Sequence, residues 1–183
     1  MGGVRSRTSE GAEPGPTRTD TDPSLSAALA SVVSGARRRA VRDGDRQVDT
    51  AHLLHSLLEH DPRVREVFDG GPQIARLLGY LVQRSIGYGL QWQGTVEDSG
   101  AVPVLASAKE TVLSPAAAGA METARARAVL CGETEARGID LLAALAADPE
   151  SRAAEVLRRA GVDTDALLAR VESDEETGGE PQW

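Results

Sequence analysis

The sequence is poor in cysteine, aromatic residues and lysine. Of its 183 residues five are aromatic, and Lys109 is the only lysine beside nineteen arginines. The single cysteine, Cys131, excludes an internal disulfide, and nothing in the sequence indicates an oxidising compartment. A core with so few aromatic residues must be built from Leu, Val and Ala, which favours an all-α bundle over a β-sandwich.

Long apolar runs are missing as well. The first 22 residues lack the apolar segment of a secretory signal peptide, and no window approaches the roughly 18 apolar residues of a membrane span. We therefore expect a soluble, cytoplasmic protein with no membrane partner. The formal net charge of −8 argues against general affinity for nucleic acid or for acidic membranes.

Catalytic motifs are also missing. No HExxH, P-loop, GxSxG or GxGxxG motif occurs, so we expect neither an enzyme nor a cofactor. His52, His55 and His60 fall close together, and the first two could share a helix face as zinc ligands do. However, no cysteine is nearby, and a third ligand from Glu59 or Asp61 would lie on a different face. The pattern favours packed or solvated histidines over a metal site.

What the sequence does contain is a duplication. The stretch AVRDGDRQVDTAHLLHSLL at 40–58 returns as AVLCGETEARGIDLLAALA at 128–146, 88 residues later. The shared positions are alanine, valine, glycine and leucine, as expected when one packing unit is repeated. The sequence therefore predicts an all-α fold of two pseudo-symmetric four-helix repeats, eight helices in all, about a pseudo-twofold axis.

The predicted organisation has five segments. They are a disordered arm at 1–21, a first repeat at 22–84, a linker at 85–112, a second repeat at 113–172 and an acidic tail at 173–183. Residues 22–172 are expected to form one compact domain. The arm is too polar to bury a core, and the acidic, Gly-containing tail should be mobile. In the linker, Tyr88, Leu90 and Trp92 alternate, which makes a small β-hairpin a candidate there.

Caps and helix breakers set the predicted helix boundaries. Polar-Pro pairs that place a capping side chain before a proline at the first helical position occur at Asp22-Pro23, Asp61-Pro62, Ser114-Pro115 and Asp148-Pro149. Asp49 or Thr50 caps the second helix, Asp163 caps the eighth, and Gly44, Gly70, Gly132 and Gly161 end helices or break the chain. The fourth helix is expected to point Ile74, Leu77, Leu78, Leu81 and Val82 inward.

Five arginines gather near the end of the first predicted helix: Arg37, Arg38, Arg39, Arg42 and Arg46. Basic residues at a helix C-terminus complement the helix dipole, which is sufficient reason for their presence. Consecutive residues fan out by about 100° each, so the first three do not form one stripe along a groove. Nucleic-acid binding is disfavoured, and binding of an acidic peptide or phosphoprotein is the alternative reading of the cluster.

At the repeats the sequence resembles the N-terminal domain of Clp/Hsp100 ATPases, most closely the ClpC type. Val48 to Leu54, VDTAHLL, matches the central segment of the family repeat, Leu113-Ser114-Pro115 matches the opening of its second repeat, and Ala153 to Leu157 followed by Gly161-Val162-Asp163 matches its end. The resemblance covers about 24–84 and 113–172. The AAA+ ATPase modules are absent from the sequence, so we expect a stand-alone copy of the domain.

The resemblance implies a docking module that receives adaptors and clients of a Clp ATPase, or sequesters them. The alternative is a protein that binds or sequesters a small molecule or a peptide in the groove between the repeats. The aromatic residues near the linker, Tyr80, Tyr88 and Trp92, are the candidate anchors, with Arg37 and Arg38 as candidate polar contacts. ClpC-type members hold phosphorylated arginine with acidic residues of the repeats, and those positions are Ala51 and Ile139 here, so that role does not carry over.

Overall fold

The computed structural model describes residues 24–85 and 112–178, which form eight helices and four two-residue strands. The first half holds β1 (Ser24–Leu25), α1 (Ala27–Asp43), β2 (Gln47–Val48), α2 (Thr50–His60), α3 (Pro62–Glu66) and α4 (Gly71–Ser85). The second half holds β3 (Val112–Leu113), α5 (Pro115–Leu130), β4 (Glu135–Ala136), α6 (Gly138–Ala147), α7 (Arg152–Arg159) and α8 (Thr164–Gly178). The predicted all-α architecture of two four-helix repeats is confirmed.

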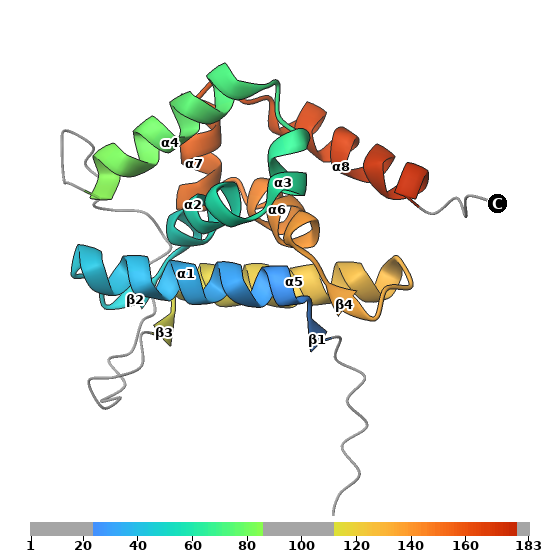
Figure 1. Ribbon diagram of the computed structural model, residues 1–183, viewed down its shortest axis with the longest axis horizontal. Coiled ribbons are helices and arrows are strands. Elements are labelled where there is room, and N and C mark those ends of the chain that lie inside the picture. The colour runs from blue at the N-terminus through green and yellow to red at the C-terminus, as the bar shows by residue number, and fades with distance from the viewer. Residues whose placement is uncertain (1–23, 86–111, 179–183) are drawn as a thin grey trace, which may run out of the picture.

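The helices stack in layers (Figure 1). The long helices α1 and α5 run antiparallel along one side of the molecule, α2 and α6 lie above them, and α4 and α8 form the opposite side. Helix α1 packs on α2 and α5 packs on α6, while α2 also contacts α6 and α7. The two halves are thus joined through their central helices.

Short strands exchange between the two halves. Strand β1, which opens the first repeat, pairs in parallel with β4 of the second, and β2 of the first pairs in parallel with β3. The hydrogen bonds that follow are equivalent: Ser26 N donates to Ala136 O at 2.9 Å and Ser114 N donates to Val48 O at 2.8 Å. Each residue of one pairing lies 88 positions from its counterpart in the other, so the sequence duplication becomes a pseudo-twofold symmetry.

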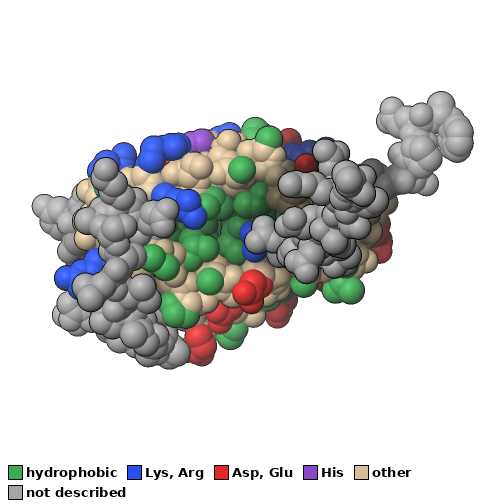
Figure 2. Space-filling model, turned by 90° about the horizontal axis from the view of Figure 1, so that it is seen from below, with side chains coloured by type: hydrophobic (Ala, Val, Ile, Leu, Met, Phe, Trp, Pro, Cys, Tyr) green, Lys and Arg blue, Asp and Glu red, His purple; other side chains and the backbone are tan. Residues whose placement is uncertain are grey.

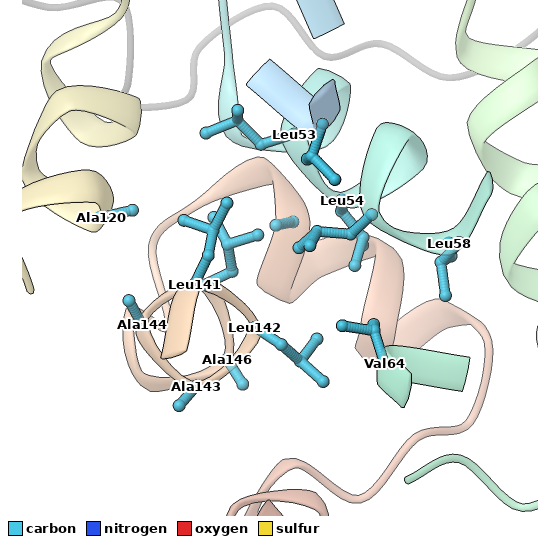
Figure 3. Packing of buried hydrophobic residues seen from close by; sticks show 14 of the residues in the cluster. Leu53, Leu54, Leu58, Val64, Ala120, Leu141, Leu142, Ala143, Ala144 and Ala146 are labelled. Carbon is cyan, nitrogen blue, oxygen red and sulfur yellow. The ribbon is translucent and has the colours of Figure 1, made fainter. Parts of the chain in front are cut away.

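The core is built on the leucine pairs of the duplicated stretch. Leu53 and Leu54 of α2 and Leu141 and Leu142 of α6 are all fully buried, and they point into the space between the two helices (Figure 3). Burying a leucine side chain contributes about 1.5–3 kcal/mol. Alanines such as Ala120 fill the remaining positions and let the helices approach closely, as the scarcity of aromatic residues required.

Most predicted caps are found. The Asp49 carboxylate accepts from the backbone N–H of His52, and Ser114 Oγ accepts from Ala117 N ahead of Pro115. Asp61 caps α3, and Asp163 accepts from the N–H groups that begin α8. The helix breaks at Gly44, Gly70, Gly132 and Gly161 coincide with the positive-φ glycines of the described residues.

Two predicted helix starts are wrong. Helix α1 begins at Ala27, because Ser26 caps it and the two residues before Ser26 are held in β1. Helix α7 begins at Arg152 and not at Pro149, because Ser151 Oγ accepts from Ala154 N, while the Asp148 carboxylate closes a tight turn onto Glu150 N. In both cases a serine that follows the Asp-Pro pair, Ser26 or Ser151, supplies the cap.

Two further details differ from expectation. Val82, expected to point inward, is 47% exposed. Helix α8 continues to Gly178, so the first residues of the predicted acidic tail are helical. The arm at 1–21 and the candidate hairpin lie outside the described residues. None of the described helices is both long enough and apolar enough to cross a membrane.

Candidate functional site

The candidate interaction surface is the face formed by α1 and α5. Each of these helices packs inward on its own repeat, and the two do not pack closely on each other. Seen from this side, hydrophobic side chains gather in the middle of the face, where the surface is hollowed, and arginine side chains stand beside the hollow (Figure 2). The arrangement is an open apolar depression with a charged edge.

Helix geometry identifies the two flanks of this depression. Gly35 and Arg39 face α2, where Gly35 lies against Ser56 and Arg39 pairs with Glu59 at 2.6 Å. The opposite flank of α1 faces α5. Its residues are Ala30, Val33 and Arg37, and the equivalent residues of α5 are Ala118, Met121 and Arg125. We call these six residues and the depression between them the α1–α5 groove.

The groove is apolar at its centre and charged at its ends. Val33 is half-buried against the core and lines the middle of the α1 flank, while Met121 is 4% exposed and lies beneath the surface at the middle of the α5 flank. The two helices run antiparallel (Figure 1), and Arg37 and Arg125 each lie in the second half of their helix, so they are displaced toward opposite ends of the groove. Arg37 is exposed and Arg125 is half-buried. A groove with apolar anchors and a polar rim is the form in which proteins bind peptide segments.

A second polar cluster surrounds the start of α2. His52 and Asp49 form a reciprocal cap: the Asp49 carboxylate accepts from His52 N at 2.8 Å, and His52 Nδ1 accepts from Asp49 N at 3.0 Å. Since Nδ1 accepts, the neutral ring carries its proton on Nε2. That nitrogen faces Asp45 at 3.0 Å and Asp43 at 3.7 Å. Burial lowers the pKa of His52, although the two aspartates oppose the shift.

The same geometry decides against a metal ion at Asp43, Asp45 and His52, the one group in the described part of the chain with metal-ligand spacing. A metal would take the lone pair of Nε2. With Nδ1 already accepting the Asp49 N–H, the ring would have no proton and would have to be an imidazolate. Metal-bound histidines instead donate their second N–H to an acceptor. The cluster does not fit a metal and is read as a buried hydrogen-bonded cap.

Asp49 also ties the repeats together. Its carboxylate, only 3% exposed, contacts the guanidinium of Arg84 from α4 and that of Arg152 from α7, the latter at 3.0 Å. Beside it, Thr50 Oγ1 accepts from Ala153 N at 3.1 Å. The first turn of α2 therefore anchors a helix of each repeat, which is a structural role.

The equivalent cluster in the second repeat has its charges inverted. Arg137 and Asp140 stand where Asp49 and His52 stand in the first repeat, and Arg137 N donates to the fully buried Asp140 carboxylate at 2.7 Å. Burial raises the pKa of Asp140, against the lowering effect of Arg137 and Arg127. Glu175 of α8 completes the cluster through Arg127 at 2.8 Å.

Two titratable groups near these clusters have shifted pKa values. Burial, assisted by the charge of Arg39, lowers the pKa of His55 to about 4, so His55 is neutral at physiological pH. At the end of α5, Cys131 is exposed and its thiol donates to Glu175 at 3.4 Å. Partial desolvation and the Glu175 carboxylate raise the pKa of Cys131, which disfavours a reactive thiolate.

The candidate site residues from the sequence are not brought together. Tyr80 is half-buried against the core from α4, on the side of the molecule away from the groove. Tyr88 and Trp92 lie outside the described residues. Arg37 and Arg38 are exposed on α1, and only Arg37 belongs to the groove. Their roles in binding stay predictions.

Arg125, the counterpart of Arg37 on the other flank of the groove, was not among the residues singled out from the sequence. A signal for it was present, because Arg125 lies 88 residues after Arg37 and so occupies the equivalent position of the second repeat. Ala51 is fully buried and Ile139 is 7% exposed, and neither side chain carries a carboxylate.

These features define a class of protein: a duplicated all-α domain whose two four-helix repeats exchange short strands. That is the fold of the N-terminal domains of Clp/Hsp100 proteins. The Hsp104 N-terminal domain from Candida albicans matches with a TM-score of 0.64 and 12% identity, over 87% of this chain and 94% of that chain. The N-terminal domain of the chaperone ClpD from Arabidopsis thaliana matches with a TM-score of 0.60 and 18% identity, over 83% and 94%.

A third similar structure comes from structural work on a malarial protein secretion system. It has a TM-score of 0.64 and 17% identity, and the match covers 86% of this chain and 99% of that chain. No protein-family model matches the chain, and no curated protein matches its sequence. The chain therefore has the Clp N-domain fold, as the resemblance in the repeats implied.

Proposed function

We propose that this chain is a non-enzymatic protein-interaction module of the Clp N-domain type, which docks or sequesters adaptors or clients of a Clp ATPase. The observation that carries the proposal is the α1–α5 groove. It is an apolar depression with arginine side chains beside it (Figure 2), and apolar surfaces with a polar rim mark binding sites.

The polar clusters support this proposal because their side chains are already used in structural contacts. Among the described residues, the groove is therefore the strongest candidate for a binding site. Asp49, His52, Asp140 and Arg137 are engaged in capping helices and joining elements. None of them is arranged as a nucleophile with a base, and the neutral His55 is packed against Glu59 of its own helix at 3.4 Å. Their chemistry is structural, which is consistent with a binding module.

The second candidate ligand of the groove is a small molecule or a peptide. The apolar centre of the groove and its two terminal arginines would hold such a ligand in the same way as a protein segment. A ligand that binds only the folded chain raises its melting temperature, so a thermal-shift screen with small molecules and peptides tests this candidate separately.

The main test is capture of a partner followed by a groove variant. Tagged full-length chain is used to recover proteins from an extract of the source cells, and any recovered Clp ATPase, adaptor or client is purified and its binding measured directly. The double variant Ala30→Asp with Ala118→Asp places one charge on each flank of the groove and should abolish binding, because an unpaired carboxylate is costly to desolvate.

The matched control is Ala28→Asp. Ala28 is exposed on the same helix, two positions from Ala30 and therefore about 200° around the helix axis. It should bind as the wild type does. If the groove variant retains full affinity for the purified partner, or if no Clp component, adaptor or client is ever recovered, the proposed function is wrong.

A further inference from the structure

The charges at the ends of the α1–α5 groove carry information about its ligand. The chain as a whole is acidic, with a formal charge of −8, yet both ends of the groove carry arginine. Among the described residues, neither Arg37 nor Arg125 makes an ion pair. By contrast Arg39, on the other flank of α1, is paired with Glu59 at 2.6 Å.

We propose that the groove selects an apolar peptide segment of a partner protein that carries acidic residues at its ends, with the stronger acidic contact on the Arg37 side. This inference rests on the proposed function, because it assumes that the groove binds peptide. Val33, together with the exposed Ala30 and the half-buried Ala118, contacts the apolar middle of the segment. The two guanidinium groups pair with its terminal carboxylates.

The two ends differ in the strength of their positive charge. Beside Arg37, α1 presents Arg38, also exposed, whose equivalent on α5 is Ala126. Beside Arg125, α5 presents the exposed Glu122, three positions earlier and on a neighbouring part of the helix surface. The α5 end is therefore partly neutralised, while the α1 end is not, and this difference fixes the direction in which an asymmetric acidic segment lies.

Charge at the rim of an interface acts mainly on association rate and specificity, and the effect falls with salt. Exposed ion pairs of this kind change affinity by a small factor each. Replacing an attractive arginine by glutamate also introduces repulsion, so we expect Arg37→Glu to weaken binding of an acidic segment by about threefold to tenfold at low salt. Arg125→Glu should have a smaller effect because Glu122 already offsets part of its charge.

The test uses three fluorescent peptides that share one apolar core, Leu-Val-Leu-Val, and carry Asp-Glu, Ser-Gly or Lys-Lys at both ends. Binding to the full-length chain is followed by fluorescence anisotropy at low and at high salt. The acidic peptide should bind most tightly, Arg37→Glu should remove its advantage, and Arg37→Glu with Arg125→Glu should make the Lys-Lys peptide the preferred one. Arg76→Glu, an exposed arginine on α4, is the matched control and should change nothing.

Each outcome decides one of the two proposals. If the three peptides bind equally and Ala30→Asp with Ala118→Asp blocks all of them, the charge selection is refuted and the proposed function stands. If none binds, the charge selection is refuted, and the capture experiment alone decides the proposed function. If single-stranded DNA displaces the acidic peptide at equal affinity, the arginines belong to a nucleic-acid site and the peptide selection is refuted. Circular dichroism melting confirms that each surface variant is folded.

Discussion

The most demanding prediction concerns Asp49, where one carboxylate caps α2 and faces two arginines from different repeats. The perturbation is Asp49→Asn. Asparagine keeps an oxygen that can accept the His52 N–H, so the helix cap is preserved. What is lost is the negative charge facing Arg84 and Arg152, whose side chains are each only 10% exposed.

The expected magnitude follows from this geometry. At 3.0 Å, the Asp49–Arg152 separation, two unit charges attract by about 5.5 kcal/mol at an effective dielectric constant of about 20. Desolvation offsets part of this attraction, and removing one partner of a buried pair costs about 3–5 kcal/mol in measured cases. Because both arginines retain some solvent contact, we expect a loss of about 3 kcal/mol in the free energy of unfolding. For a chain of this size that lowers the melting temperature by about 6–12 °C.

The assay is urea unfolding followed by circular dichroism, with Glu59→Gln as the matched control. Glu59 is also on α2 and also pairs with an arginine, but its side chain is 38% exposed. The control should therefore cost at most about 1 kcal/mol. If Asp49→Asn costs no more than Glu59→Gln, the argument that the first turn of α2 anchors both repeats is refuted.

Two further predictions concern other buried positions. A Cβ at Gly138 would clash with the Asp61 carboxylate, whereas one at Gly119 would meet nothing within 4 Å. In urea titrations Gly138→Ala should therefore cost about 1–3 kcal/mol, and Gly119→Ala should stabilise the chain by about 0.5–1 kcal/mol. Equal effects of the two substitutions would contradict the contact. The pKa of His55 is lowered from 6.5 to about 4 in the folded chain, so the unfolded chain binds the extra proton between these values and stability should fall as pH drops from about 6.5 to about 4, then level off. Stability titrations of His55→Gln should lack this component, up to about 3 kcal/mol, and an unchanged pH profile would show that His55 does not contribute it.

Much of the fold could be predicted from local patterns. Helix periodicity, glycine breaks and capping side chains act within a few residues, so the helices after Asp49, Ser114 and Asp163 begin where the sequence indicates. The start of α7 was predicted at the wrong residue, and the reason is also local. Ser151 and Asp148 could each cap this helix, and which of them does so depends on the turn between them. Val82 was wrongly predicted to point inward. Periodicity identifies the apolar face of a helix, but it does not show how far the neighbouring elements extend over that face.

The candidate site could be predicted only in part. Arg37 was singled out from the basic cluster on α1, but its significance depends on Arg125, which belongs to the other repeat and was signalled only by the 88-residue repeat spacing. The histidines were expected to be structural, and the structure places His52 in a buried reciprocal cap with Asp49. The position of Tyr80, which lies in α4 and packs on the core away from the groove, could not be read from its closeness in sequence to the linker.

The sequence by itself determined the duplication, the helical class and the identity of the core, because these depend on spacing along the chain and on which side chains leave water. Only the tertiary structure decided the exchange of β1 with β4 and β2 with β3, since two-residue strands carry no periodic pattern and gain their hydrogen bonds from the opposite repeat. It also decided that Glu175 reaches Arg127 across the second repeat. The groove belongs to the same category, because the pseudo-twofold arrangement of two antiparallel helices places Arg37 and Arg125 at its opposite ends.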